Sequence, residues 1–128
     1  MRLLLDTHAL LWWLLDDAAL SQTAQREMRN SVNDVFVSAV SGWEIAIKYK
    51  LGKLPNAAPL VVGLDTAVAR EGFVELPITL RDGERAGSLP MLHKDPFDRM
   101  LIAQALTDSL VLVSNEGIFD RYGVARLW

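Results

Sequence analysis

The chain begins with two leucine-rich runs that are separated by one acidic residue, Asp6. Residues 2–5 (RLLL) show no alternation of polar and apolar side chains, which is typical of a strand buried on both faces of a parallel sheet. A helix is expected over residues 8–15. Because burying an unpaired carboxylate costs several kcal/mol, Asp6 needs a partner from another part of the chain.

Segments with strand and helix patterns alternate along the rest of the sequence. β-Branched and aromatic runs predict strands at residues 34–38, 73–76, 110–114 and 124–128. Helices are predicted at residues 21–32, 41–50, 60–70, 79–86 and from residue 96 to the fourth strand, with a turn and short helix at residues 115–122. The alternation predicts an α/β fold in which helices cover both faces of a mostly parallel sheet.

Composition is that of a compact globular protein. The 128 residues are 51% hydrophobic and 23% charged, which predicts one domain, residues 1–128, with its own core. The absence of cysteine excludes a disulfide scaffold and thiolate zinc sites, and it fits a reducing compartment. A net charge of −3 argues against a basic surface that covers the whole molecule.

The apolar start of the chain is too short for a membrane segment. Asp6, Thr7 and His8 interrupt it, and residues 9–15 fall far short of the roughly 20 residues that a membrane-spanning helix needs. No small-residue cleavage site of a signal peptide follows. We therefore expect a cytoplasmic protein with no membrane partner.

Four acidic residues are predicted to meet at one edge of the sheet. In open parallel sheets, ligands bind beyond the carboxyl ends of the strands, where the strand order reverses. Asp6 directly follows the first strand, and Glu116 lies two residues beyond the fourth. Glu44 lies one turn into the helix after the second strand, and Asp98 lies in the first turn of the helix that starts at residue 96.

Each acid also has a purely structural interpretation. Asp6 can cap the helix that follows it, the helix dipole favours Asp98 in a first turn, and Glu116 can be a surface turn residue. Asp95 precedes a proline and is best explained as a helix N-cap. Glu44 is harder to explain in this way, because its neighbours in the sequence are apolar.

Taken together, the acids favour a metal site. Carboxylates that lie within a few ångströms repel one another, and one of them takes up a proton unless a cation lies between them. Oxygen ligands without cysteine, in a chain with only two histidines, select Mg²⁺ or Mn²⁺ rather than zinc. Such an ion lowers the pKa of a bound water molecule and orients it for attack at phosphorus. This interpretation gives Asp6 the partner that it needs.

Four segments resemble the successive motifs of PIN-domain ribonucleases, especially bacterial VapC-type toxins. They are LLLDTHALLWWL, VSAVSGWEIAIKYKLGKL, HKDPFDRMLIAQAL and LVLVSNEGIFDRYGV, and together they cover nearly the whole chain. The resemblance implies a three-layer α/β/α sandwich with a five-stranded, mostly parallel sheet. It also implies an endoribonuclease that depends on Mg²⁺ or Mn²⁺, a homodimer, and neutralisation by a cognate antitoxin encoded alongside.

The resemblance assigns catalytic metal ligands residue by residue. Asp6, Glu44 and Asp98 match the family's first three acidic ligands. Glu116 stands where the family most often has Asp after the fourth strand. Because Glu is one methylene longer than Asp, direct ligation, ligation through water and a side chain that points away all stay open.

Three further residues are candidates for supporting these ligands. The hydroxyl of Thr7 can orient Asp6 or a water molecule at the site, or it can act as a cap. Ser41 precedes Glu44 by about one helical turn, and the resemblance makes it a supporting residue, with an N-cap as the alternative. Arg99 can contact phosphate or brace a ligand, and a surface salt bridge is the competing interpretation.

The RNA-binding surface is less well defined by the sequence. Lysines that flank the acid motifs can form a basic rim that attracts phosphates, although such charges are usually a solvated helix face. No aromatic platform or RNA-binding motif indicates a base preference. His8 is interpreted as structural rather than as a base, and Gln104 and the pair Trp12–Trp13 as packing or interface residues.

Other functions fit the sequence less well. An aspartate-nucleophile phosphatase also has an acid after its first strand, but it needs a second acid where His8 stands. A receiver-type phosphoacceptor domain needs an Asp at the end of its third strand, where this chain has Glu75 and Leu76. The remaining alternative is a noncatalytic PIN-like binding module in which the change to Glu116 has degraded the metal site.

Overall fold

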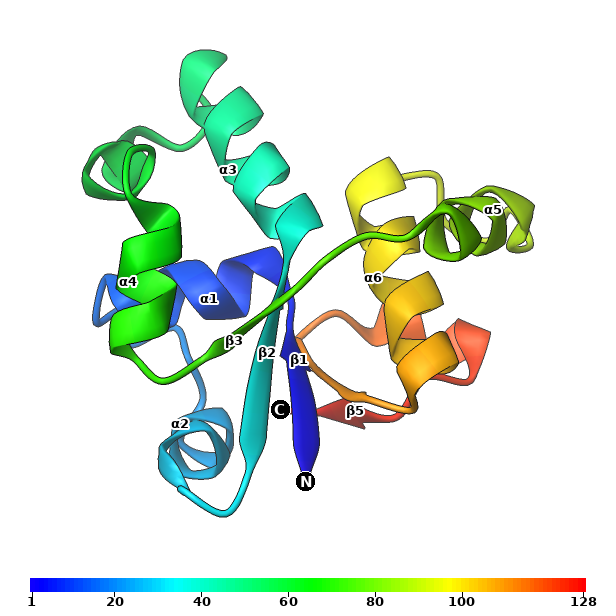
Figure 1. Ribbon diagram of the computed structural model, residues 1–128, viewed down its shortest axis with the longest axis horizontal. Helices are drawn as coiled ribbons and strands as arrows, with labels where there is room; N and C mark the ends of the chain where they lie inside the picture. The colour runs from blue at the N-terminus through cyan, green and yellow to red at the C-terminus, as the bar shows by residue number, and fades with distance from the viewer.

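The computed structural model describes residues 1–128 and contains one five-stranded, entirely parallel sheet (Figure 1). The strands are β1 (Arg2–Leu5), β2 (Asp34–Ser38), β3 (Val74–Leu76), β4 (Val111–Val113) and β5 (Arg126–Leu127), in the order β3-β2-β1-β4-β5. The predicted α/β fold with a parallel sheet is confirmed.

Helices and short 3₁₀ segments connect the strands. They are α1 (Thr7–Leu14), α2 (Gln22–Arg29), α3 (Ala39–Lys50), η1 (Pro55–Leu60), α4 (Leu64–Arg70), α5 (Leu80–Ser88), α6 (Pro96–Asp108) and η2 (Gly117–Tyr122). None of these helices combines the length and the hydrophobicity that crossing a membrane requires.

Some predicted boundaries are wrong. The helix expected to start at residue 60 begins at Leu64, because the chain before it forms η1, which contains two prolines that lack N–H donors. Helix α2 ends at Arg29 instead of continuing to residue 32. The last predicted strand shrinks from five residues to Arg126–Leu127. The elements themselves are all present in the predicted order.

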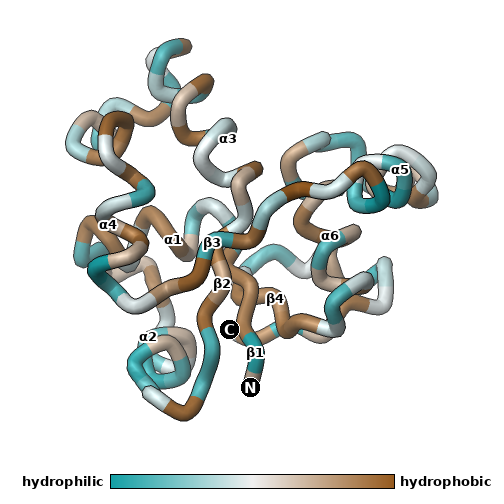
Figure 2. Tube along the Cα trace, in the orientation of Figure 1, coloured by the Kyte–Doolittle hydropathy of each residue, from teal (hydrophilic) through white to brown (hydrophobic).

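The sheet separates two hydrophobic cores. Leu3 and Leu5 of β1 face one core, which also holds Val37 and residues of α1, α2 and α4. Leu4 faces the opposite core together with Leu112, residues of α6 and residues of η2. Figure 2 shows mainly hydrophobic residues along β2 and β4. Because both faces of the sheet are covered, the strands lack the polar alternation of a half-exposed sheet.

The strand order reverses between β1 and β4, which is the position at which open parallel sheets generally bind ligands. The chain proceeds from β1 through β2 to β3 on one side, and then returns to β4 on the other side of β1. Leu5 pairs with Val113, and the N–H of Asp6 donates to the carbonyl of Val113 at 3.1 Å. The residues that follow these two strands therefore start side by side at the switch point.

Candidate functional site

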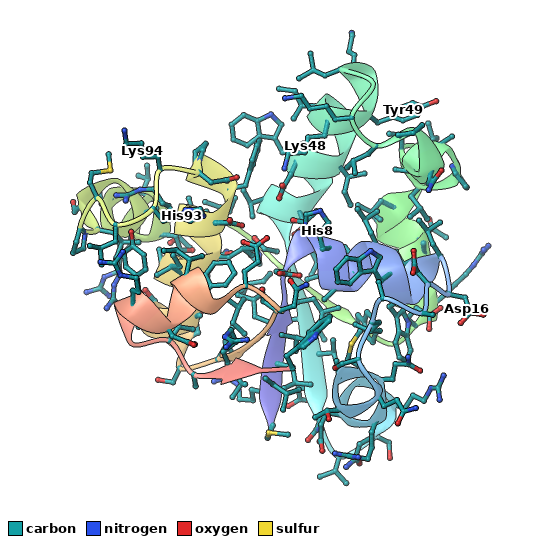
Figure 3. All side chains as sticks on the ribbon, turned by 180° about the vertical axis from the view of Figure 1, so that it is seen from behind. His8, Asp16, Lys48, Tyr49, His93 and Lys94 are labelled. Carbon is teal, nitrogen blue, oxygen red and sulfur yellow. The ribbon has the colours of Figure 1, made fainter.

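A polar pocket of about 160 Å³ contains all four acids that the sequence singles out. It is lined by Asp6, Thr7, His8, Glu44, Lys48, His93, Asp95, Asp98 and Glu116, none of which is hydrophobic. Figure 3 shows three of these side chains, His8, Lys48 and His93, which come from α1, α3 and the segment before α6. Because a water molecule occupies about 30 Å³ of liquid, the pocket has room for a cation with several waters.

Asp6 serves as a helix cap and also faces this pocket. It is the N-cap of α1, and its Oδ1 accepts a hydrogen bond from the N–H of Ala9 at 2.7 Å. Burial raises the pKa of the Asp6 carboxyl above its usual value, and the negative charge of Glu116 adds to this rise. Hydrogen bonds from Ser114 and Ala9 act in the opposite direction. The capping interpretation is confirmed, and it uses only one of the two oxygens.

Glu44 is buried and each of its oxygens has a partner. Ser38 caps α3, which places Glu44 in the second turn of the helix. The hydroxyl of Thr7 donates to Glu44 Oε1 at 2.6 Å, and the hydroxyls of Thr7 and Ser41 are 3.0 Å apart. The ammonium of Lys48 contacts Glu44 Oε2. Thr7 and Ser41 therefore form a hydroxyl pair that orients Glu44, and the N-cap of α3 is not Ser41.

Lys48 carries a positive charge into the acidic pocket. Burial opposes that charge, but the hydrogen bond and the negative charge of Glu44 outweigh burial and raise the pKa of Lys48. The charges of Asp95 and Asp98 act in the same direction. The sequence indicated Lys48 only as part of a basic rim. Its spacing of four residues from Glu44 on one helix is the signal from which this contact follows.

Asp98 lies at the start of α6 next to a histidine. Asp95 caps this helix and accepts from the N–H groups of Phe97 and Asp98 at 2.9 and 3.1 Å, which confirms its predicted capping role. His93 Nε2 lies 2.7 Å from Asp98 Oδ2. Burial raises the pKa of Asp98 to about 6, the hydrogen bond with His93 opposes the rise, and the neighbouring carboxylates add to it.

Glu116 points towards the other acids. One ligand atom each from His93, Asp98 and Glu116 lies within 4.8 Å of the other two. Glu116 is positioned by the turn between β4 and η2, where its N–H donates to the hydroxyl of Ser114 at 3.0 Å. The alternative in which the longer side chain of Glu116 points away from the site is therefore wrong.

Arg99 holds the segment that carries His93. The side chain is buried, and its guanidinium donates to the carbonyls of Gly87, Leu89, Pro90 and His93 at 2.8–3.3 Å. No carboxylate pairs with it, so the surface salt bridge considered from the sequence is wrong. Arg99 therefore braces the loop between α5 and α6 and acts on the pocket only through His93.

His93 is the pocket residue that the sequence analysis missed. Its role depends on the turn at Asp95, which folds residues 93–95 back over the first turn of α6. The signal available was a histidine five residues before an acid, with a capping Asp-Pro pair between them. A histidine at this spacing can contact the acid only if the helix starts at the proline, as it does here.

Other predicted residues are packing residues. Trp12 and Trp13 are half-buried against the core that contains Leu3, and the Trp13 ring lies tilted against the ring of Phe73, with centroids 5.7 Å apart. Gln104 is fully buried on α6, and its amide donates to the carbonyl of Pro77 at 3.2 Å. These contacts agree with the packing interpretation.

The donor set of the pocket fits a divalent cation. Five carboxylates face one ammonium group and two imidazoles, so negative charge exceeds positive charge at neutral pH. Burial and neighbouring carboxylates raise the pKa values of both Asp6 and Asp98, which is the expected response to unfavourable negative charge. Carboxylate oxygens are the ligands that Mg²⁺ and Mn²⁺ prefer.

Comparisons with known proteins agree with this geometry. The family model described as "PIN domain" matches residues 3–125. Among solved structures, the chain is similar to VapBC2 from Rickettsia felis bound to a DNA fragment from its promoter, with a TM-score of 0.68 and 16% sequence identity. That alignment covers 99% of this chain and 98% of the other, and at this identity it shows a shared fold. No curated protein matches the sequence.

Proposed function

Because this chain belongs to the PIN-domain family, we propose that it is a metal-dependent endoribonuclease that hydrolyses phosphodiester bonds of RNA in the acid pocket. The observation that carries the proposal is the convergence of Asp6, Glu44, Asp98 and Glu116 in one pocket. They come from four separate segments, and they meet beyond the carboxyl ends of β1 and β4. Residues 1–128 form the PIN domain in this proposal.

The four acids are the proposed ligands of Mg²⁺ or Mn²⁺. When bound, a divalent cation lowers the pKa of a water molecule and stabilises negative charge on the phosphate. Thr7 fixes the orientation of Glu44, and His93 fixes that of Asp98. Lys48 supplies a positive charge that can shift from Glu44 to a phosphate when the pocket is loaded.

We also propose the biological role of a toxin. The fold similarity to VapBC2 supports a VapC-type toxin of a type II toxin–antitoxin pair, neutralised by a cognate antitoxin. In this role the chain acts in the cytoplasm as a homodimer. Two pockets in one dimer would give a long RNA two adjacent binding sites.

Cleavage of a mixed RNA pool tests the nuclease proposal. The purified chain, free of bound antitoxin, is incubated with RNA in Mg²⁺, in Mn²⁺ and in EDTA. We expect cleavage only with a metal, and a loss of about 100-fold or more in Asp6→Asn, Glu44→Gln and Asp98→Asn. Glu84→Gln, an exposed acid on α5, is the matched control and should cleave normally. Undiminished cleavage by one of the pocket variants removes that residue from the mechanism.

One observation favours a second candidate function, a noncatalytic binding module. Lys48 already neutralises Glu44, as it would in a pocket that holds no cation. If the folded chain binds RNA or a protein partner but cleaves nothing in either metal, the binding module replaces the nuclease.

A further inference from the structure

We propose that the exposed indole of Trp43 is a stacking platform for a base of single-stranded RNA at the rim of the acid pocket, an inference that rests on the proposed ribonuclease function. The sequence alone did not indicate an aromatic platform. The structure does, through the exposure of this side chain, its position and its neighbours.

Trp43 differs from the other tryptophans of the chain in its packing. Trp12, Trp13 and Trp128 are half-buried, and all three pack against the core that contains Leu3. Trp43 is 58% exposed and packs against neither hydrophobic core. The fold therefore does not use most of this ring for its own stability, and the ring is available to a ligand.

Trp43 stands beside the acids of the pocket. It immediately precedes Glu44 on α3, and its ring meets the ring of Phe97 edge to face, with centroids 4.9 Å apart. Phe97 immediately precedes Asp98 on α6. The aromatic pair therefore joins the two helices that supply two of the four acids. A base on Trp43 would belong to a nucleotide at or next to the reacting phosphate.

A positive charge lies next to the aromatic pair. The Nζ atom of Lys48 is 5.7 Å from the centroid of the Phe97 ring, and it also contacts Glu44. An aromatic ring for a base and an ammonium for a phosphate, set next to each other, are the combination by which proteins hold single-stranded nucleic acids. Because every base has a π face, stacking here raises affinity without selecting a sequence.

The apolar side chains next to Trp43 point to a competing ligand of this surface, a second protein chain. Ile47 and Leu51 are 39% and 63% exposed and follow Trp43 at four-residue intervals, so all three lie along one side of α3. A second protein chain on this side would cover all three residues. A base can stack only on Trp43, which is the aromatic residue of the three and the one that precedes the pocket residue Glu44.

The test compares two ligands of equal length and charge. One is a uridine oligomer of about 12 nucleotides, and the other is an abasic ribose-phosphate oligomer. Both affinities are measured in EDTA, where no cleavage is expected. The affinity for the uridine oligomer divided by the affinity for the abasic oligomer isolates the contribution of the bases. We expect this ratio to fall about 10-fold in Trp43→Leu, to recover in part in Trp43→Phe, and to stay unchanged in Leu51→Ala.

Intrinsic fluorescence gives a second readout of stacking, and sedimentation reports the oligomeric state of each variant. The uridine oligomer should quench tryptophan fluorescence in the wild type more than in Trp43→Phe. An unchanged affinity ratio in Trp43→Leu overturns the inference. This holds also if the variant changes the oligomeric state, because Trp43 would then contact a second protein chain and not a base. Equal quenching in the wild type and Trp43→Phe also overturns it. By contrast, a wild type that binds neither oligomer argues against the proposed RNA substrate itself.

Discussion

At the scale of single residues, the oxygens of three pocket acids are already oriented by hydrogen bonds. Asp6 accepts from the backbone of Ala9, Glu44 accepts from Thr7, and Asp98 is paired with His93. Ligands that are held in this way bind a metal more tightly than free side chains, because less motion is lost on binding. Substitution of an orienting residue should therefore weaken metal binding without removing a ligand.

Thr7→Val tests this orientation at Glu44. Valine keeps the shape of threonine but cannot donate to Glu44 Oε1. We expect Mn²⁺ affinity to fall by about 10- to 100-fold, which is typical for the loss of a hydrogen bond to a ligand. Isothermal titration calorimetry measures the change, and Thr66→Val at an exposed position of α4 is the control. Equal Mn²⁺ affinity in Thr7→Val and the wild type would show that Glu44 needs no orientation.

Asp98→Asn tests the cost of the buried negative charge. Burial raises the pKa of Asp98 from 3.8 to about 6. Between these values the unfolded chain loses its proton before the folded chain does, so the wild type loses stability as pH rises through this window. In EDTA at pH 7.5 the Asn variant should be more stable by roughly 2–3 kcal/mol, at about 1.4 kcal/mol per pKa unit.

The pH dependence provides the control for this prediction. Near pH 4 most of the difference between the wild type and Asp98→Asn should disappear, because Asp98 is then protonated in the folded wild type and is close to the midpoint of its titration in the unfolded chain. Urea denaturation at both pH values measures the two free energies of unfolding. A variant that is less stable than the wild type at pH 7.5 contradicts the prediction.

At the scale of elements, one arginine of α6 makes most of the side-chain hydrogen bonds to the loop before that helix. Arg99 donates four hydrogen bonds to carbonyls between Gly87 and His93. A lysine has three donors on one nitrogen and cannot reach carbonyls spread over seven residues in the same way. The loop, and with it the imidazole next to Asp98, therefore depends on this guanidinium together with the hydroxyl of Tyr122, which donates to the carbonyl of Pro90 at 2.7 Å and accepts from the N–H of His93 at 2.9 Å.

Arg99→Ala should destabilise the fold and also weaken the pocket. We expect a loss of about 2–4 kcal/mol in the free energy of unfolding, because several buried carbonyls lose their donor. Mn²⁺ affinity should fall as well, since the backbone of His93 loses one of the two hydrogen bonds that hold it near Asp98. Arg81→Ala, at an exposed position of α5, should change neither quantity. Denaturation by guanidinium chloride that is identical for the two variants would refute the bracing role.

The elements also show how far the sequence can be interpreted. Every strand and α-helix was predicted in order, because runs such as RLLL and the Asp95–Pro96 cap are local signals. The start of α4 at Leu64 was missed because the residues before it form η1, a 3₁₀ segment with two prolines, instead of the first turn of the helix. His93 was missed for a similar reason, since its contact with Asp98 needs the loop that Arg99 holds.

At the scale of the whole molecule, the pocket joins parts of the chain that are far apart in the sequence. Figure 1 shows α1 to α4 on one side of the strands and α5 and α6 on the other, with the carboxyl ends of β1 and β2 between α3 and α6. Glu44 comes from the first group and Asp98 from the second. A cation bound by both would connect the two groups, and its binding energy would add to the stability of the fold.

Thermal unfolding with and without Mn²⁺ tests this linkage. At a Mn²⁺ concentration of 100 times the dissociation constant, the gain in stability should be about 2.7 kcal/mol, seen as a higher Tm. In Asp6→Asn and Glu44→Gln the shift in Tm at the same concentration should be much smaller. Shifts of equal size in these variants and in the wild type would place the ion outside the pocket.

The most direct measurement is anomalous scattering from a crystal of the chain soaked in Mn²⁺. We expect a strong anomalous peak in the pocket, in contact with carboxylate oxygens from at least two of the residues Asp6, Glu44, Asp98 and Glu116. A pocket without a peak at saturating Mn²⁺, in which the ammonium of Lys48 still contacts Glu44 and the four acids share no ion, would contradict the proposed metal site.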